Sequence, residues 1–144
     1  MPRLPILALV LALTASSLAT KEPSLDELIA RANSAPVKDQ PSLYVEIAER
    51  QLKSADELYI AGNVEEARKS VSDIVTYSEK AHDAAIQSGK KVKSVEMAVR
   101  KMSHKLNDVK RTLNFEDQAP VGEAADQLQK LADDLLTYMF RKGK

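Results

Sequence analysis

The chain has 144 residues, the size of one domain with a sizeable core, and its 21 basic residues balance its 21 acidic ones. Net charge therefore gives no global argument for binding nucleic acid or a membrane, and the lack of tryptophan and the scarcity of other aromatics speak against a carbohydrate-binding or base-stacking surface. Because cysteine is absent, stability has to come from packing and not from disulfides.

The first 19 residues have the three parts of a secretory signal peptide. Arg3 gives a positive start, a nearly unbroken apolar run follows from Leu4 to Leu13, and Ser17 and Ala19 frame a small-residue cleavage pattern. The run is shorter than the roughly 20 residues that a membrane-spanning helix needs, and no cysteine follows it to carry a bacterial lipoprotein anchor. We expect cleavage near Ala19 and export to the periplasm or the cell exterior, in preference to an N-terminal membrane anchor or a buried helix. Residues 20–144 are then expected to form a single helical domain.

Two signals place the first helices after the signal peptide. Ser24 and Glu27 form a capping-box pattern, which predicts a short helix over residues 24–35. Pro41 suits the first position of the next helix, because its missing N–H would have no partner there. The next proline after it is Pro120.

Gly62 and Gly89 divide this proline-free stretch into three long helices, the last of them running from about residue 90 to residue 115. Asn63 and Glu66 are placed as the N-cap and third residue of the middle helix. The third helix has the most regular pattern, because its apolar residues lie alternately three and four positions apart and so form one stripe. That stripe consists of Val92, Val95, Val99, Met102, Leu106, Val109 and Leu113.

The end of the chain predicts one more helix. Residues 116–119 form a polar connection, and Pro120 is expected to start a helix whose wide apolar face, including Leu128 to Leu136, should contact two neighbours. Short connections make consecutive helices antiparallel. The sequence therefore predicts an all-α fold, an antiparallel bundle of four long helices plus a short N-terminal helix. We expect a monomer, although the regular spacing would also suit a coiled-coil dimer.

One segment resembles a known helical repeat. The small and aromatic residues around Gly62 resemble the turn region of a tetratricopeptide repeat over residues 44–81. The sequence departs from that family in lacking the closing proline near Glu79 and a second copy at the repeat period. The peptide-binding groove of the family is therefore not carried over. The whole of residues 20–144 is also similar to small exported bacterial all-helical proteins, a likeness that implies no particular function. The residues that carry the repeat resemblance are Ala55, Leu58, Tyr59, Gly62, Val64 and Ala67.

The strongest local feature is a basic side on the helix at residues 90–115. Eight lysines and arginines lie between Lys90 and Arg111 against only Glu96 and Asp108, and the last helix has the opposite bias. The two helices could simply be electrostatically matched neighbours with a solvated outer face. Alternatively, the face docks a partner, with an apolar Met97 among the cations adding buried area. The candidate partner-binding residues are Lys93, Met97, Arg100, Lys101, His104 and Arg111.

His82 and His104 suggest a metal or haem site, because four-helix bundles can hold both. About their turn at Gly89 the two lie some 12 Å apart along the helix axes, at about 1.5 Å per residue, so they should not share a metal. His82 flanks the apolar face of the middle helix, between Gly62 and Gly89, and is expected to be a boundary residue with satisfied hydrogen bonds. His82 and Asp83 should point about 100° apart, which does not suit a catalytic pair. We therefore expect no cofactor, no metal and no enzymatic activity.

These observations favour an exported, non-enzymatic helical interaction or scaffolding protein. It would bind an unknown protein partner through the basic outer face of the helix at residues 90–115, and the charge of that face would suit an acidic one. One alternative is a binder of polyanions or of an anionic lipid surface, with a membrane surface possible and no nucleic acid expected. The other alternative is a carrier of a metal or cofactor in a four-helix bundle.

Overall fold

The computed structural model describes residues 22–142, and within them the chain is helical with no β-strand. The prediction of an all-α fold with four long helices and a short N-terminal one is confirmed. The predicted signal peptide lies outside the described residues. Within them, no helix is long and apolar enough to cross a membrane. The helices are α1 (Leu25–Ser34), α2 (Gln40–Ile60), α3 (Val64–Ser88), α4 (Val92–Arg111) and α5 (Phe115–Lys142).

The capping box predicted for α1 is present. The Ser24 hydroxyl accepts from the backbone N–H of Glu27 at 3.2 Å, and the Glu27 carboxylate accepts from the backbone N–H of Ser24 at 3.3 Å. Leu28 and Ala32 are buried and hold α1 against α2. The Gln40 side chain donates to the Ala32 carbonyl at 3.1 Å, so the turn between the helices is tied to the end of α1.

The apolar stripes meet in one core. In the predicted stripe of α4, every residue from Val92 to Val109 is buried, and Leu113 is partly buried. At about 1.5–3 kcal/mol for each large apolar side chain removed from water, this burial is the main source of stability that the chain offers. All five helices contribute side chains with almost no exposed surface, including Leu28, Ile47, Ile74, Leu106, Leu128 and Leu135.

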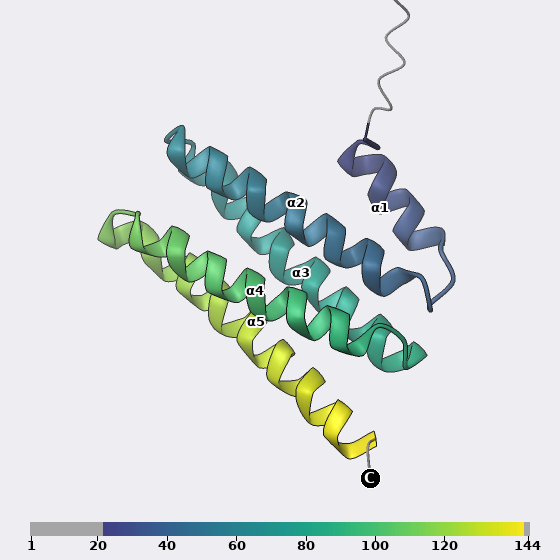
Figure 1. The fold of residues 1–144 in the computed structure, drawn as a ribbon. Helices are drawn as coiled ribbons and strands as arrows, with labels where there is room; N and C mark the ends of the chain where they lie inside the picture. The colour runs from purple at the N-terminus through teal and green to yellow at the C-terminus, as the bar shows by residue number, and fades with distance from the viewer. Residues whose placement is uncertain (1–21, 143–144) are drawn as a thin grey trace, which may run out of the picture.

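The four long helices form two antiparallel hairpins that lie side by side (Figure 1). The hairpin of α2 and α3 packs on the hairpin of α4 and α5 chiefly through α3 against α5. Because the direction alternates along the chain, α2 runs beside α4 in the same direction, and α3 runs beside α5. Within the described residues α2 does not contact α5. The side of the bundle between α2 and α4 is therefore less filled than the side between α3 and α5.

The structure corrects two predicted boundaries. α4 ends at Arg111, and α5 begins at Phe115, so the expected polar connection at residues 116–119 is helical and Pro120 lies inside the helix. Pro120 is the sixth residue of α5, where it removes the bond that its N–H would donate to the Glu116 carbonyl and its ring crowds that carbonyl, so the rest of this 28-residue helix has to offset the cost. The first turn is also supported by the Gln118 side chain, which donates to the Leu113 carbonyl at 3.1 Å.

A third prediction holds only in part. Asn63 is the N-cap of α3, but its side chain makes no capping hydrogen bond. The first turn is closed instead by the backbone, with the N–H of Ala67 donating to the Asn63 carbonyl at 3.0 Å. The glycine turns are as expected, since Gly62 and Gly89 both have positive φ, 81° and 66°.

Candidate functional site

An open groove runs along the less filled side of the bundle, between α2 and α4. It has a volume of about 790 Å³. Its floor is apolar, and its rims carry lysines on α4 and charges of both signs on α2. The lining residues are Glu49, Leu52, Lys53 and Asp56 from α2, and Met97, Ala98, Lys101, Met102 and Lys105 from α4.

Two of the predicted partner-binding residues line this groove. Met97 is 59% exposed, which is unusual for so apolar a side chain, and Lys101 is exposed beside it. Met97 and the predicted residue Lys93 also border a shallower hollow at the start of α4, together with Lys91. The structure therefore brings Lys93, Met97 and Lys101 together along one edge of α4. Their role in binding stays a prediction.

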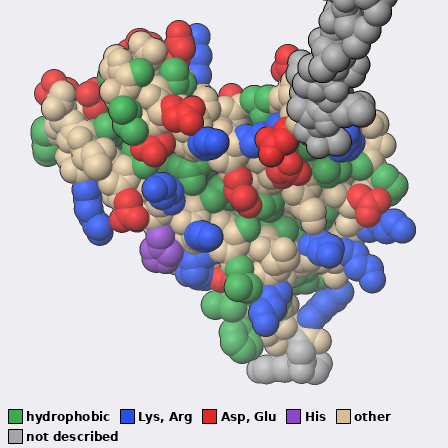
Figure 2. Space-filling view, turned by 45° about the horizontal axis from the view of Figure 1, so that its top comes forward, with side chains coloured by type: hydrophobic (Ala, Val, Ile, Leu, Met, Phe, Trp, Pro, Cys, Tyr) green, Lys and Arg blue, Asp and Glu red, His purple; other side chains and the backbone are tan. Residues whose placement is uncertain are grey.

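The other three predicted residues lie apart from the groove. Arg111 is exposed and pairs with Asp108 one turn away on the same helix, at 3.3 Å. His104 is exposed on the outer surface of α4. In Figure 2, Lys and Arg side chains are spread over one face of the molecule, in several places beside Asp and Glu. The six predicted residues therefore do not form one contiguous site.

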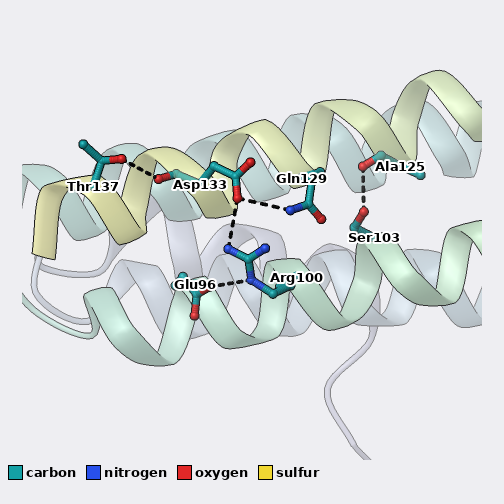
Figure 3. A network of polar contacts seen from close by, with 7 residues as sticks. All are labelled: Glu96, Arg100, Ser103, Ala125, Gln129, Asp133 and Thr137. Carbon is teal, nitrogen blue, oxygen red and sulfur yellow. Dashed lines mark hydrogen bonds and ion pairs between the residues drawn. The ribbon is translucent and has the colours of Figure 1, made fainter. Parts of the chain in front are cut away.

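Arg100 belongs to a network between α4 and α5 (Figure 3). Its Nε donates to Glu96 at 2.6 Å, and a terminal guanidinium nitrogen donates to Asp133 of α5 at 3.1 Å. Asp133 also accepts from Gln129 at 3.1 Å, one turn earlier on α5. Hydrogen bonds to both carboxylates, Glu96 before Asp133, raise the pKa of Arg100. Its guanidinium is therefore already used within the bundle, as expected for electrostatically matched neighbouring helices.

A second polar contact holds the same two helices together. Ser103 is buried on α4, and its hydroxyl donates to the backbone carbonyl of Ala125 on α5 at 2.7 Å (Figure 3). This bond orients the buried face of α4 toward α5. The opposite edge of α4, with Met97 and Lys101, consequently turns toward α2 and the groove.

His82 bridges α3 and α5. One ring nitrogen bonds Asp83 at 2.8 Å and the other bonds Asp134, and the side chain is only 15% exposed. The expectation of a satisfied boundary residue is confirmed. The expectation that His82 and Asp83 point apart is wrong, because rotation about their side-chain bonds brings the groups together. Burial lowers the pKa of His82, but the bonds to Asp83 and Asp134 and their negative charges outweigh burial and raise that pKa above 6.5.

This arrangement leaves His82 without a free ring nitrogen. Each of its nitrogens faces a different carboxylate, so the two carboxylates flank the imidazole and the three groups do not converge on a common point. In residues 22–142, no group of three or more His, Asp or Glu side chains has an arrangement that could hold a metal ion.

The sequence missed the α2 side of the groove. In the sequence, Glu49, Lys53 and Asp56 have no signal that sets them apart from other exposed charges, and Leu52 has none that sets it apart from the other apolar residues of its helix. Lys105 was counted as one of the basic residues of α4 without a place in a site. A groove between two helices depends on how the hairpins stack, so no local pattern could have shown it.

Compared with protein-family models, curated proteins and solved structures, the chain matches none of them.

Proposed function

We propose that this chain is an exported, non-enzymatic helical interaction protein that holds a helical segment of a partner protein in the groove between α2 and α4. The observation that carries the proposal is the exposed Met97 at the edge of an apolar groove. A methionine fits irregular apolar surfaces because its side chain is flexible and polarizable, and it gains buried area only when something covers it. The predicted signal peptide supports export.

The size of the groove suits an amphipathic helix. On α2 it extends from Glu49 to Asp56 and on α4 from Met97 to Lys105, which corresponds to about 10–12 Å at about 1.5 Å per residue. A helix of two to three turns with apolar residues at positions i, i+3 or i+4, and i+7 would cover this length. Leu52, Met97 and Met102 would contact those apolar residues.

The rims indicate the charge of the partner. Within the described residues, Lys101 and Lys105 on the α4 rim form no ion pair. The α2 rim, in contrast, has Glu49, Lys53 and Asp56 with mixed signs. A partner helix with acidic residues on the side facing α4 would match both rims. Such charges would set the orientation and speed of docking, and the apolar floor would supply most of the affinity.

Site-specific crosslinking in the native host tests this proposal. A photo-crosslinking amino acid is introduced at Lys53 or Lys105 on the rims, and at Thr76 on α3 as a control site that is exposed but outside the groove. We expect both rim positions to give an adduct with the same protein, and the crosslinked peptide to fall in an amphipathic helix with acidic residues. The Thr76 position should not give it.

A pair of variants tests whether the adduct depends on the groove or on exposed apolar surface in general. Met97→Asp should remove the adduct, and Ile60→Asp, the same kind of change at an even more exposed apolar residue at the end of α2, should leave it intact. Circular dichroism should show both variants folded, because both side chains are exposed. An adduct that survives Met97→Asp, or that forms equally at Thr76, would show that the groove is not the docking site.

A further inference from the structure

One end of the bundle carries cations without any acidic residue nearby in sequence. The chain has no Asp or Glu from Ala84 to Val95, nor from Leu135 to its end. Those two segments form the α3–α4 turn, the first turn of α4 and the last turns of α5. We name as the basic tip their described cations and two exposed apolar residues, namely Lys90, Lys91, Lys93, Leu136, Phe140, Arg141 and Lys142.

The two segments of the basic tip lie against each other. Lys142 of α5 reaches the α3–α4 turn, where a Cβ built on Gly89 would lie 3.3 Å from the Lys142 Nζ. The same Nζ lies 5.5 Å from the centre of the Tyr138 ring, and the Tyr138 hydroxyl would lie 4.0 Å from that Cβ, so the last turns of α5 lie beside the turn. The cations of the turn and those at the end of α5 therefore act on the same region of surface.

Helix register places Phe140 level with Lys93. Arg100 of α4 pairs with Asp133 of α5 at 3.1 Å, and the two helices are antiparallel. Lys93 lies seven residues before Arg100 and Phe140 lies seven residues after Asp133, so both lie two turns from that pair in the same direction and on the same helix faces. Both residues are exposed. A cation and an aromatic ring thus share one outer surface of this hairpin.

The apolar side chains of the basic tip are exposed to solvent. Phe140 is 70% exposed, and Leu136, one turn before it on the same face of α5, is 38% exposed. Figure 2 shows Lys and Arg side chains around protruding hydrophobic ones at the end of the molecule where α5 stops, with almost no Asp or Glu among them. This mixture of exposed aromatic ring and uncompensated cations is typical of surfaces that meet a lipid bilayer at its interface.

We infer that the basic tip attaches the protein to the surface of an anionic membrane. The lysines and Arg141 contact lipid phosphates, and Phe140 enters the boundary between headgroups and acyl chains. A soluble polyanion would satisfy the cations but would leave Phe140 in water, which is why the observations favour a bilayer. The inference does not depend on the proposed groove, because none of the residues that line the groove, including the exposed Met97, Lys101 and Lys105 of α4, belongs to the basic tip.

The absence of tryptophan allows a direct test. Phe140→Trp puts a single fluorophore at the basic tip, and Phe115→Trp puts one at the opposite end of the bundle, where Phe115 is 88% exposed. The full chain is mixed with vesicles of equimolar phosphatidylglycerol and phosphatidylcholine. We expect the emission of the Phe140→Trp protein to move to shorter wavelength and to be quenched by brominated lipid, with no such change for Phe115→Trp. Residues 1–21 are the same in both proteins and so cannot produce the difference.

Charge reversal gives the second arm of the test. Lys90→Glu with Lys93→Glu should weaken partition of the Phe140→Trp protein by at least about 25-fold, since each lost cation near an anionic surface contributes about fivefold and the two new carboxylates are repelled as well. The control, Lys69→Glu with Lys130→Glu, makes the same change in net charge at exposed lysines outside the basic tip and should have a much smaller effect. Added salt should also weaken binding of the unaltered tip.

Three results would overturn the inference. One is an equal response of the fluorophores at positions 140 and 115, and another is an equal effect of the two charge reversals. The third is salt-sensitive binding of heparin without any shift of the Phe140→Trp emission on vesicles. That third result would assign the basic tip to a polyanion instead of a membrane.

Discussion

The network between α4 and α5 predicts that Arg100 contributes more to stability than an arginine on a solvated helix face would. The Glu96 side chain that it contacts at 2.6 Å is only 10% exposed, whereas Asp133, at 3.1 Å, is 60% exposed. Arg100→Met keeps an apolar stem of similar length but leaves the Glu96 carboxylate mostly out of water without its partner. An unpaired charged group of this kind costs about 1–3 kcal/mol, and loss of the exposed pair adds less than about 1 kcal/mol.

We therefore expect Arg100→Met to lower the free energy of unfolding by about 2–3 kcal/mol. For a domain of this size that corresponds to a fall in melting temperature of about 6–10 °C. Thermal and urea unfolding, followed by circular dichroism, measure both quantities. Asp133→Asn should cost less than about 1 kcal/mol, because Asp133 is largely solvated.

A double-mutant cycle identifies the cause. If the cost of Arg100→Met comes from the stranded Glu96 carboxylate, Glu96→Gln in the same chain should recover a large part of it, because a neutral amide is cheaper to bury. Two results would contradict this explanation. One is a loss of stability for Arg100→Met no larger than that for Asp133→Asn. The other is a double variant in which the stability losses of Arg100→Met and Glu96→Gln simply add. Arg100 would then be available to a partner, as the sequence alone suggests.

Three other predictions concern single residues. His82 has a raised pKa, so its protonated form stabilises the fold fully below pH 6.5 and loses that effect as the pH rises through the folded-state pKa. His82→Asn should therefore lower the melting temperature more at acidic than at alkaline pH. A decrease that does not depend on pH would contradict the bridge to Asp134. Lys91 has a φ of 61°, so Lys91→Gly should raise stability by about 0.5–1 kcal/mol in urea unfolding, whereas a loss would mean that the turn is unstrained. Ser103→Ala should lower the free energy of unfolding by about 1 kcal/mol, because it loses a buried hydrogen bond of 2.7 Å. Ser78→Ala should leave that free energy unchanged in the same assay, because within residues 22–142 the buried Ser78 hydroxyl has no hydrogen-bond partner. Equal losses for the two variants would contradict this difference.

The parts of the fold that depend on neighbours in sequence could be predicted. The capping box of Ser24 and Glu27 needs only three residues of spacing, and the buried stripe of α4 follows from helical periodicity. The turns at Gly62 and Gly89 follow from the backbone freedom of glycine. The prediction failed at Pro120, where a local rule for helix starts competed with a helix that already had side-chain and backbone support upstream.

The candidate site could be predicted only on one side. Helical periodicity correctly separated the outer face of α4 from its buried stripe, and so identified Lys93, Met97 and His104 as exposed. It could not show that Arg100 lies at the edge next to α5, where Asp133 reaches it from 33 positions along the chain. The α2 rim depends on the stacking of two hairpins, which is set by the whole core and not by any one helix.

Asp133 and Asp134, adjacent on α5, reach different helices, since Asp133 pairs with Arg100 on α4 and Asp134 with His82 on α3. Successive residues of a helix point about 100° apart, so the two contacts can form together at only one rotation of α5 about its own axis. A slide along the axis or a turn in either direction would break at least one of them. Both aspartates are largely exposed, so each pair contributes less than about 1 kcal/mol, and together they favour the orientation of α5 that its buried face sets, and with it the direction in which Phe140 projects.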